Sequence, residues 1–420
     1  MSKINVEHDI NIHLENRRVS RCFFVFIFTM YTLVCMTKNC FNGALADIVS
    51  EGVLTKSQTG LITAMFYIVY TPLQIVGGIA ADKFSPERMI KIGLIGGAIA
   101  NAVIFFNHNY YVMLVSWILN AVVQFALWPS TYKIISSQLC RSDRTQMIFL
   151  IVLATSAGLV VSYGVAGILS SWEYNFALSA IVLFLLAVGL HIYDGYLSRF
   201  MKRDTKPEAD EGNPEFVSSA STGSVFWKSG FFIMLLAILG YTIVSQGSKT
   251  LFPVMVLESF DTGASLGNLL NTLIVISGIV GIFVLRFVLY PKFIKNEVFG
   301  MLIFMALTSV LCLILVLTME FSVVVVTFCA TSFTTTIVGL LVTYYNAQFV
   351  KYGKNGTAAG VSNAASALGY AVSSYGIVKI SEIYDWQTVK VVWLVLSLIT
   401  VVSLAVILPM YVRFKSKGIK

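Results

Sequence analysis

Apolar runs of about 20 or more residues recur along the whole chain, and each is long enough to cross roughly 30 Å of hydrocarbon as a helix. Of the 420 residues, 57% are hydrophobic and only 12% are charged. A soluble fold of this size buries far less apolar surface than such a composition supplies. The recurrence of these runs therefore predicts an all-α integral membrane protein.

The runs predict twelve transmembrane helices in two sets of six. Residues 21–46, 58–80, 88–107, 110–136, 146–170 and 173–194 form the first set, and residues 228–257, 264–290, 297–318, 321–349, 356–381 and 387–412 form the second. A polar stretch from about 198 to 225 separates them and indicates a flexible linker. We therefore expect two pseudo-symmetric six-helix bundles.

The predicted domain boundaries follow from these runs. The first bundle covers 21–195 and the second covers 228–412, with a cytoplasmic linker at 196–227 between them. A cytoplasmic segment precedes the first bundle at 1–20, and a cytoplasmic tail follows the second at 413–420. Residues 1–20 contain no small-residue cleavage site, so we expect the first span to be retained.

The net charge of +8 has a topological explanation. Basic residues lie in alternate connections: Arg17, Arg18, Arg21, Lys83, Arg88, Lys91, Lys133, Arg141, Arg144, Lys292, Lys295, Lys351, Lys354 and the tail from Arg413 to Lys420. Lys56, Lys379 and Lys390 are the main exceptions. This alternation predicts that both termini are cytoplasmic in a cell membrane. It leaves no basic surface that needs a nucleic-acid partner.

Two similar stretches each place a lysine inside an apolar span. They run from Tyr31 to Lys38 (YTLVCMTK) and from Tyr241 to Lys249 (YTIVSQGSK), about 210 residues apart. An unpaired ammonium in hydrocarbon is costly, so such residues mark functional sites more often than packing. The pair predicts two related halves that each contribute a cation to one site at the bilayer midplane.

Each of these residues also has a structural interpretation. Lys38 lies about 17 residues beyond Arg21, or roughly 25 Å along a helix, too far to reach the cytoplasmic surface. Lys249 could instead extend its ammonium to the outer interface. Tyr31 and Tyr241 could be packing aromatics, although their similar spacing to the two lysines favours a site.

A charged turn follows the second span, and it is the first part of the chain to resemble a known family. Gly78, Asp82 and Lys83, with Arg88 beyond them, match the cytoplasmic G-x-x-x-D-(R/K) signature of the major facilitator superfamily. Glycine allows close helix contact, and an acid between bases can form a latch that stabilises one conformation. In the second half Leu285 stands where the acid would be expected, so a second latch is weaker.

Two further motifs resemble the organophosphate:phosphate antiporters within that superfamily. One runs from Gln124 to Trp128 and Pro129, and the other from Lys354 through Gly356 to Gly360. The resemblance implies the twelve-helix major facilitator fold, a small-molecule substrate at the midplane, and no cofactor or metal. Independently of the resemblance, Pro129 is expected to bend its span because it lacks a backbone donor.

The resemblance also implies a substrate site. Lys38 falls at the family's helix-one arginine and Tyr31 at a substrate-facing tyrosine, whereas Ser245 falls at the helix-seven arginine and leaves Lys249 one turn away. Lysine cannot make arginine's two-pronged contact to phosphate, so a weaker grip or another anion is expected. A family lysine falls on Gln74 and a family histidine near Thr155. The predicted substrate-binding residues are Tyr31, Lys38, Gln74, Gln124, Thr155, Tyr241, Ser245 and Lys249.

These observations predict a monomeric secondary transporter that moves a small organic anion, such as a phosphorylated sugar or polyol, by exchange. Two alternatives stay open: a carrier of a neutral or zwitterionic solute, and a membrane sensor of a phosphorylated solute. No Asp or Glu lies clearly inside a predicted span, where a proton-coupled carrier commonly places its titrating group. No enzyme motif is found.

Overall fold

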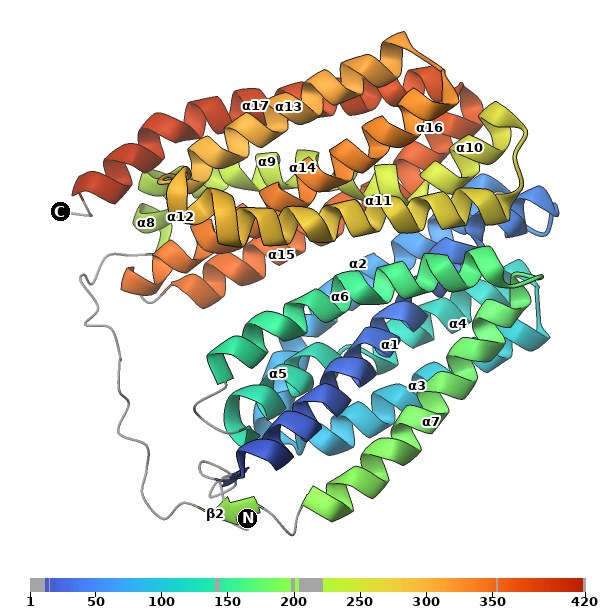
Figure 1. Cartoon of the computed structure of the whole chain (residues 1–420), viewed down its shortest axis with the longest axis vertical. Coiled ribbons are helices and arrows are strands. Elements are labelled where there is room, and N and C mark those ends of the chain that lie inside the picture. The colour runs from blue at the N-terminus through green and yellow to red at the C-terminus, as the bar shows by residue number, and fades with distance from the viewer. Residues whose placement is uncertain are drawn as a thin grey trace.

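The computed structural model describes residues 12–14, 16–139, 144–197, 201–203, 222–352 and 354–417. The described chain is almost entirely helical and forms two layers (Figure 1). One layer contains α1 to α7, and the other contains α8 to α17. This arrangement agrees with the predicted division into two bundles.

Seven helices account for the six predicted spans of the first half. They are α1 (Arg17–Ser50), α2 (Lys56–Lys83), α3 (Pro86–Phe106), α4 (Tyr110–Val123), α5 (Leu127–Gln138), α6 (Arg144–Ile168) and α7 (Glu173–Leu197). The fourth span is divided between α4 and α5. Side chains that are typical N-caps begin several of these helices, including Asn16, Thr55 and Ser85.

The second half repeats the pattern with more interruptions. Its helices are α8 (Thr222–Ser229), α9 (Phe231–Thr250), α10 (Phe252–Phe260), α11 (Ala264–Val284), α12 (Tyr290–Lys292), α13 (Glu297–Leu317), α14 (Phe321–Ala347), α15 (Asn355–Ala371), α16 (Val378–Ile383) and α17 (Trp386–Lys417). The π-helical turns η2 (Leu285–Leu289) and η4 (Val372–Ile377) join α11 to α12 and α15 to α16, and the 3₁₀ turn η3 (Gln348–Tyr352) follows α14.

Prolines explain the two divided spans. Pro129 has no N–H to donate to the residue four positions earlier, and the chain leaves the α-helix one turn before it, between α4 and α5. The predicted bend at Pro129 is thereby confirmed. Pro253 similarly follows the joint between α9 and α10, which the sequence analysis did not predict.

The seventh span begins later than predicted. Gly230 has a φ of 75°, a conformation that glycine adopts without a steric penalty, and it separates α8 from α9. Val225 and Phe226 of α8 are buried in the core of the second half. The predicted linker therefore ends in a helix that packs on the second bundle, while residues 204–221 lie outside the described residues.

Ten of the described helical segments are long and apolar enough to span a membrane. The other two predicted spans correspond to α2, with 28 residues, and to the continuous run from α15 through η4 to α16. On α3, Ile92, Ile99 and Phe106 are exposed at seven-residue intervals, so they lie along one side of the helix. Such apolar surface is what a lipid-facing helix requires.

In each half an ion pair joins the third helix of the bundle to the last. The basic residue is on the third helix in the first half and on the last helix in the second half. In the first half, Lys91 Nζ on α3 lies 2.8 Å from Asp194 Oδ2 on α7. In the second, Glu297 on α13 is buried, and its Oε2 accepts hydrogen bonds from Lys415 (3.0 Å) and Tyr411 (2.8 Å) on α17. Because a buried carboxylate needs several donors, Glu297 fixes the end of α17 against α13.

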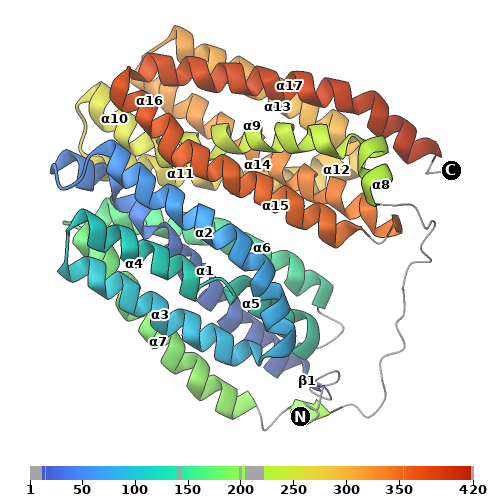
Figure 2. The same ribbon diagram turned by 180° about the vertical axis from the view of Figure 1, so that it is seen from behind.

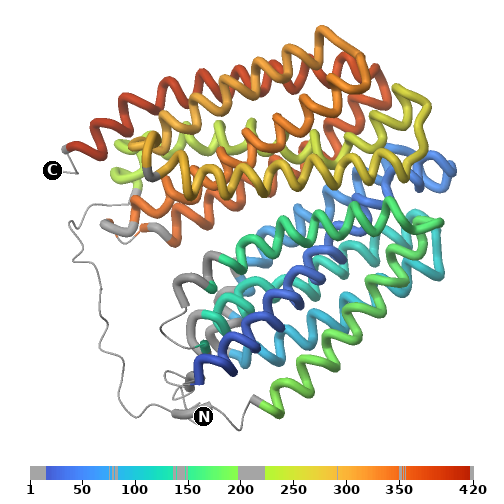
Figure 3. Tube along the Cα trace, in the orientation of Figure 1, coloured from blue at the N-terminus to red at the C-terminus, as the bar shows by residue number. Residues whose placement is uncertain are grey.

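The two layers converge toward one end of the molecule. Figures 1 and 2 show the start of α1 and the end of α17 at one end, which we call the termini face; the turns after α1, α10 and α16 lie at the other, the opposite face. The tube in Figure 3 shows the layers diverging toward the termini face. Close contacts between the halves, including Gly60 with Ser374 and Gly167 with Leu269, belong to helix ends near the opposite face.

A short two-stranded sheet lies outside the helical bundles. Strand β1 (Ile12–Leu14) pairs antiparallel with β2 (Met201–Arg203), so the segment before α1 meets the segment after α7. This pairing was not expected from the sequence.

The domain boundaries remain predictions.

A glycine contact between α1 and α6 yields a stability prediction. A Cβ added at Gly158 would lie 2.6 Å from the Thr32 carbonyl oxygen and 2.9 Å from the Met36 backbone nitrogen. Backbone atoms cannot move aside cheaply, so we expect Gly158→Ala to lower the free energy of unfolding by about 1–3 kcal/mol. Thermal unfolding of the detergent-solubilised protein measures the change.

Gly360→Ala is the matched control, because Gly360 also lies inside a helix but has no atom within 4 Å of an added Cβ. We expect this substitution to raise stability by about 0.5–1 kcal/mol. Equal melting temperatures for the two variants would contradict the packing between α1 and α6.

Candidate functional site

Lys38 lies on α1 and is surrounded by tyrosines. It is half-buried, and its Nζ donates a hydrogen bond to the Tyr70 hydroxyl at 2.8 Å. The same atom lies 4.7 Å from the ring centre of Tyr70 and 6.0 Å from that of Tyr31. Two aromatic faces attract the ammonium without neutralising it. The structure therefore brings together the predicted residues Tyr31 and Lys38.

Lys249 lies on α9 and is surrounded by hydroxyl groups. Its Nζ is 3.3 Å from Ser245 Oγ and 3.4 Å from Thr336 Oγ1 of α14. The side chain thus points back along its own helix, toward the termini face, and does not extend to the interface at the opposite face. Ser245, which the family resemblance placed at an arginine position, is thus a direct neighbour of Lys249.

Neither ammonium forms an ion pair with a carboxylate among the described residues; the ion pairs found there involve Lys56, Lys91, Lys379 and Lys415. Neutral hydroxyls and aromatic rings stabilise a cation less than a carboxylate does. Within the described residues, both ammonium groups therefore lack a carboxylate counter-charge.

Two asparagines of α11 connect the lysine-bearing helices. Asn268 Nδ2 donates to the Gly43 carbonyl at 3.0 Å, and Asn271 Nδ2 donates to the Lys249 carbonyl at 2.6 Å. Asn268 and Asn271 are about one helical turn apart, so Gly43 and Lys249 lie close to adjacent positions on α11. We call this region, where α1, α9 and α11 meet, the seam.

Lys249 forms part of the seam, and Lys38 lies a little over one turn before Gly43 on α1. Lys38 comes 21 residues after Arg17, the first residue of α1, and Lys249 comes 18 residues after Phe231, the first residue of α9. At 1.5 Å per residue these separations are about 31 Å and 27 Å. Counted from the starts of α1 and α9, the two lysines are thus at similar distances along their helices.

The remaining predicted binding residues are more dispersed. Tyr241 is buried beside Gly339 of α14, and Gln74 lies on α2 one turn beyond Tyr70. Gln124 is buried inside the first bundle, where it donates to Asn120 Oδ1. The Thr155 hydroxyl donates to the Val152 carbonyl of its own helix at 2.7 Å. The structure does not bring Gln124 or Thr155 into contact with either lysine.

The charged turn after α2 is described only in part. Gly78, Asp82 and Lys83 lie in the last turns of α2, and their side chains fall outside the described structure. The backbone N–H of Arg88 donates to the Ser85 cap at 3.4 Å, and the Arg88 residue is exposed. The cytoplasmic latch therefore remains a prediction.

Several site neighbours were absent from the sequence-based set. Tyr70, Thr336 and Asn271 contact one of the lysines directly. Across the two halves, the ring centres of Tyr67 on α2 and Tyr370 on α15 are 5.3 Å apart. One face of α2 carries Tyr67, Tyr70 and Gln74, which are spaced three and four residues apart. This spacing could have identified Tyr67 and Tyr70 from the sequence.

Three polar residues of α14 pack within the second half. The buried Tyr345 hydroxyl donates to the Ser229 carbonyl at 3.4 Å, and Asn346 Oδ1 accepts from Ser362 at 3.1 Å. The Tyr344 ring packs 4.6 Å from Tyr290.

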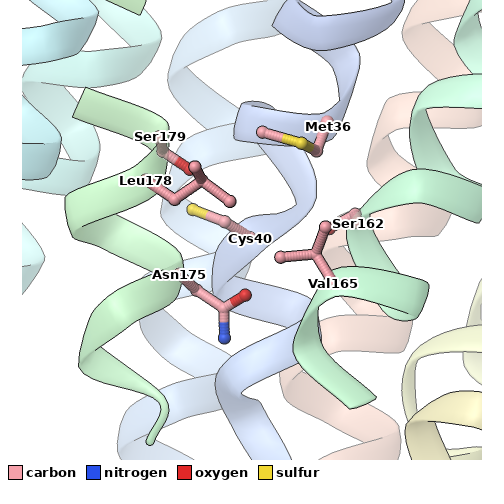
Figure 4. A pocket seen from close by; sticks show the side chains of 7 residues that line it. All are labelled: Met36, Cys40, Ser162, Val165, Asn175, Leu178 and Ser179. Atoms are coloured by element: carbon pink, nitrogen blue, oxygen red, sulfur yellow. The ribbon is translucent and has the colours of Figure 1, made fainter. Parts of the chain in front are cut away.

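Figure 4 shows a small pocket inside the first bundle, between α1, α6 and α7. Met36 and Cys40 of α1 line it, two positions before and after Lys38, and therefore face away from the Lys38 side of the helix. No charged side chain lines the pocket. It is thus separate from the lysine site.

Known proteins resemble this chain in both sequence and fold. The family model of the Major Facilitator Superfamily matches residues 27–374. The membrane sensor protein UhpC of Escherichia coli K12 is 32% identical over 114 residues, and a probable hexose phosphate transport protein of Chlamydia trachomatis is 25% identical over 121 residues. These stretches cover 27% and 29% of this chain and 26% of each relative.

Solved transporter structures share the whole fold. A bacterial homologue of the human lysosomal transporter Spinster, in an inward-facing and occupied conformation, superposes with a TM-score of 0.69 at 13% identity, covering 94% of this chain and 97% of the other. The nucleoside transporter NupG gives 0.63 at 14% identity, covering 92% and 99%. The chain belongs to the Major Facilitator Superfamily and is a multi-pass membrane protein.

Proposed function

We propose that this transporter exchanges small organic anions across the cell membrane by alternating access, with Lys38 and Lys249 as an anion clamp. One observation carries the proposal. Two lysines lie at similar distances along equivalent helices, at the seam between the halves or close to it, and their polar contacts are neutral groups. An anion bound between the halves would supply the missing counter-charge.

The clamp links binding to the movement of the halves. Two like charges that approach one another in a low-dielectric interior repel strongly, so an empty site resists closure. A bound anion screens the two ammoniums and allows the halves to close around it. A ligand that stabilises the closed state in this way favours exchange over movement of an empty carrier.

The neighbouring groups favour an anion that also carries hydroxyls. Ser245 and Thr336 can donate to an anion's oxygens beside Lys249, and Tyr70 can do so beside Lys38. A phosphorylated sugar or polyol has both features, and the similarity to probable hexose phosphate transport proteins supports this class. Because lysine binds phosphate as a point charge, we expect a modest affinity.

The proposed orientation places the termini face in the cytoplasm of a cell membrane. Basic side chains near this face include Arg18, Arg21, Lys91, Arg413 and Lys415, as the positive-inside rule requires of a cytoplasmic surface. We further propose that one chain is sufficient for transport, because both halves of the clamp come from the same chain.

Two other functions have specific support. A carrier of neutral solutes is consistent with Ser245, Gln74 and Thr155 standing where the antiporters carry cationic or titratable residues. A sensor of a phosphorylated solute is consistent with the similarity to the membrane sensor protein UhpC. A sensor would bind the anion without moving it, so flux into proteoliposomes separates it from a carrier.

A binding measurement tests the clamp at Lys38. We expect glucose-6-phosphate to raise the melting temperature of the purified protein, and Lys38→Gln to weaken the apparent affinity about tenfold or more, because one charge-assisted contact is lost. Thermal-shift titrations with glucose-6-phosphate, inorganic phosphate and glucose measure the change.

Lys292→Gln is the control for charge, because Lys292 is exposed at the end of α12. This variant should bind like the wild type. Equal stabilisation by glucose and glucose-6-phosphate would instead support the neutral-solute carrier. Unchanged anion binding by Lys38→Gln would exclude Lys38 from the clamp.

A second prediction concerns the displaced cation. Lys249→Met keeps much of the side chain's length but removes its charge, and we expect anion affinity to fall about tenfold, as for the loss of Lys38. If Lys249 only fills space, the methionine variant will bind the anion like the wild type. The same titration decides between these outcomes.

A further inference from the structure

Two carboxylates of the second half reach the start of α2 in the first half. Glu258 Oε2 of α10 lies 2.7 Å from Lys56 Nζ, and Glu382 of α16 accepts a hydrogen bond from the adjacent Ser57 hydroxyl. The paired residues are 202 and 325 positions apart in sequence. Both contacts therefore join the halves directly, at the opposite face.

A neighbour within the second half orients each carboxylate. Trp386 Nε1 donates to Glu258 Oε2 at 2.9 Å, and Lys379 Nζ donates to Glu382 Oε2 at 2.9 Å. Lys56 Nζ also lies 5.6 Å from the Trp386 ring centre. Lys56 thus meets a prearranged carboxylate and an aromatic face together. We call these six residues, Lys56, Ser57, Glu258, Lys379, Glu382 and Trp386, the clasp.

The helix dipole adds to this attraction. The N-terminus of α2 carries a partial positive charge, and its first turn contains no acidic residue of its own. Glu258 and Glu382 supply that negative charge from the other half. The clasp also accounts for two exceptions to the charge alternation, because Lys56 and Lys379 are both paired with glutamates at this face.

The seam contains a buried hydrogen-bond acceptor without a donor among the described residues. At the seam the Asn268 side chain is buried, and its Oδ1 atom has no hydrogen-bond partner among the residues that the structure describes. A buried acceptor without a donor destabilises the closed arrangement, and water would satisfy it if this face opened. Closure therefore depends on favourable contacts elsewhere between the halves.

We propose that the clasp holds the opposite face closed and that Glu258 is a positioning residue for the transport cycle. Its contacts to Lys56 must break whenever the halves separate at this face. Weakening the ion pair shifts the carrier toward the conformation that is open at the opposite face. This inference goes beyond the anion clamp, because it concerns the conformational equilibrium of the ligand-free carrier and requires no particular substrate.

Distances between spin labels test the clasp. Ser170, in the turn between α6 and α7, and Tyr384, between α16 and α17, are exposed near the opposite face on different halves. Cysteines at these positions, in a chain whose 6 native cysteines are replaced by alanine, carry the labels. Pulsed electron paramagnetic resonance on the protein in nanodiscs then reports the closed and open populations.

We expect one dominant short distance in the otherwise unchanged protein. Glu258→Gln should increase the ratio of open to closed carrier on the order of threefold, the effect of one partly exposed ion pair. Glu258→Lys should increase it further by adding repulsion. The reversed pair Lys56→Glu with Glu258→Lys should restore much of the closed population, which a purely structural role for Glu258 would not produce.

The ion pair between Lys91 and Asp194 provides the control, because both of its residues belong to the first half. Lys91→Gln should leave the distance distribution unchanged. Distributions that stay closed in both Glu258 variants would overturn the proposal, as would a charge-reversed pair that is as open as Glu258→Lys alone. If Glu258→Lys does not fold, the neutral Glu258→Gln variant decides the question.

Discussion

The central constraint on this molecule is that two ammonium groups lie inside a membrane-spanning protein beside neutral partners. Lys38 has tyrosines around it and Lys249 has hydroxyls, and neither pairs with a carboxylate among the described residues. Charged groups within membrane spans are rare, face the protein interior rather than lipid, and often mark substrate or ion pathways. Their place beside the seam therefore ties the charge of the site to the relative position of the halves.

The halves are related but differ at each level. The first half surrounds its cation with aromatic rings, whereas the second uses hydroxyls and divides its first span at Pro253. The ion pair within each half also differs: the lysine is on α3 in the pair Lys91–Asp194, whereas the carboxylate is on the equivalent helix α13 in the pair Glu297–Lys415. The two halves therefore share the position of this ion pair but not the placement of its charges.

Periodic and compositional signals predicted most of the fold, because long apolar runs have few alternatives in a bilayer. The twelve spans, the bend at Pro129 and the two lysines all follow from local sequence. The partners of those lysines do not. Tyr70 lies 32 positions from Lys38 in the sequence, and Thr336 lies 87 positions from Lys249, each on another helix. The seam likewise depends on a hydrogen bond from Asn268 to a backbone carbonyl of another helix. Tertiary pairing of this kind leaves no local pattern, and neither does the pairing of Lys56 with Glu258.

Exchange efflux from proteoliposomes tests the anion clamp most directly. Vesicles loaded with labelled glucose-6-phosphate are diluted into buffer with or without the unlabelled anion. If a bound anion must screen Lys38 and Lys249 before the halves can close, efflux into anion-containing buffer will be about tenfold faster or more, because the two ammonium groups repel one another in an empty site. Equal efflux rates into both buffers would contradict the anion clamp.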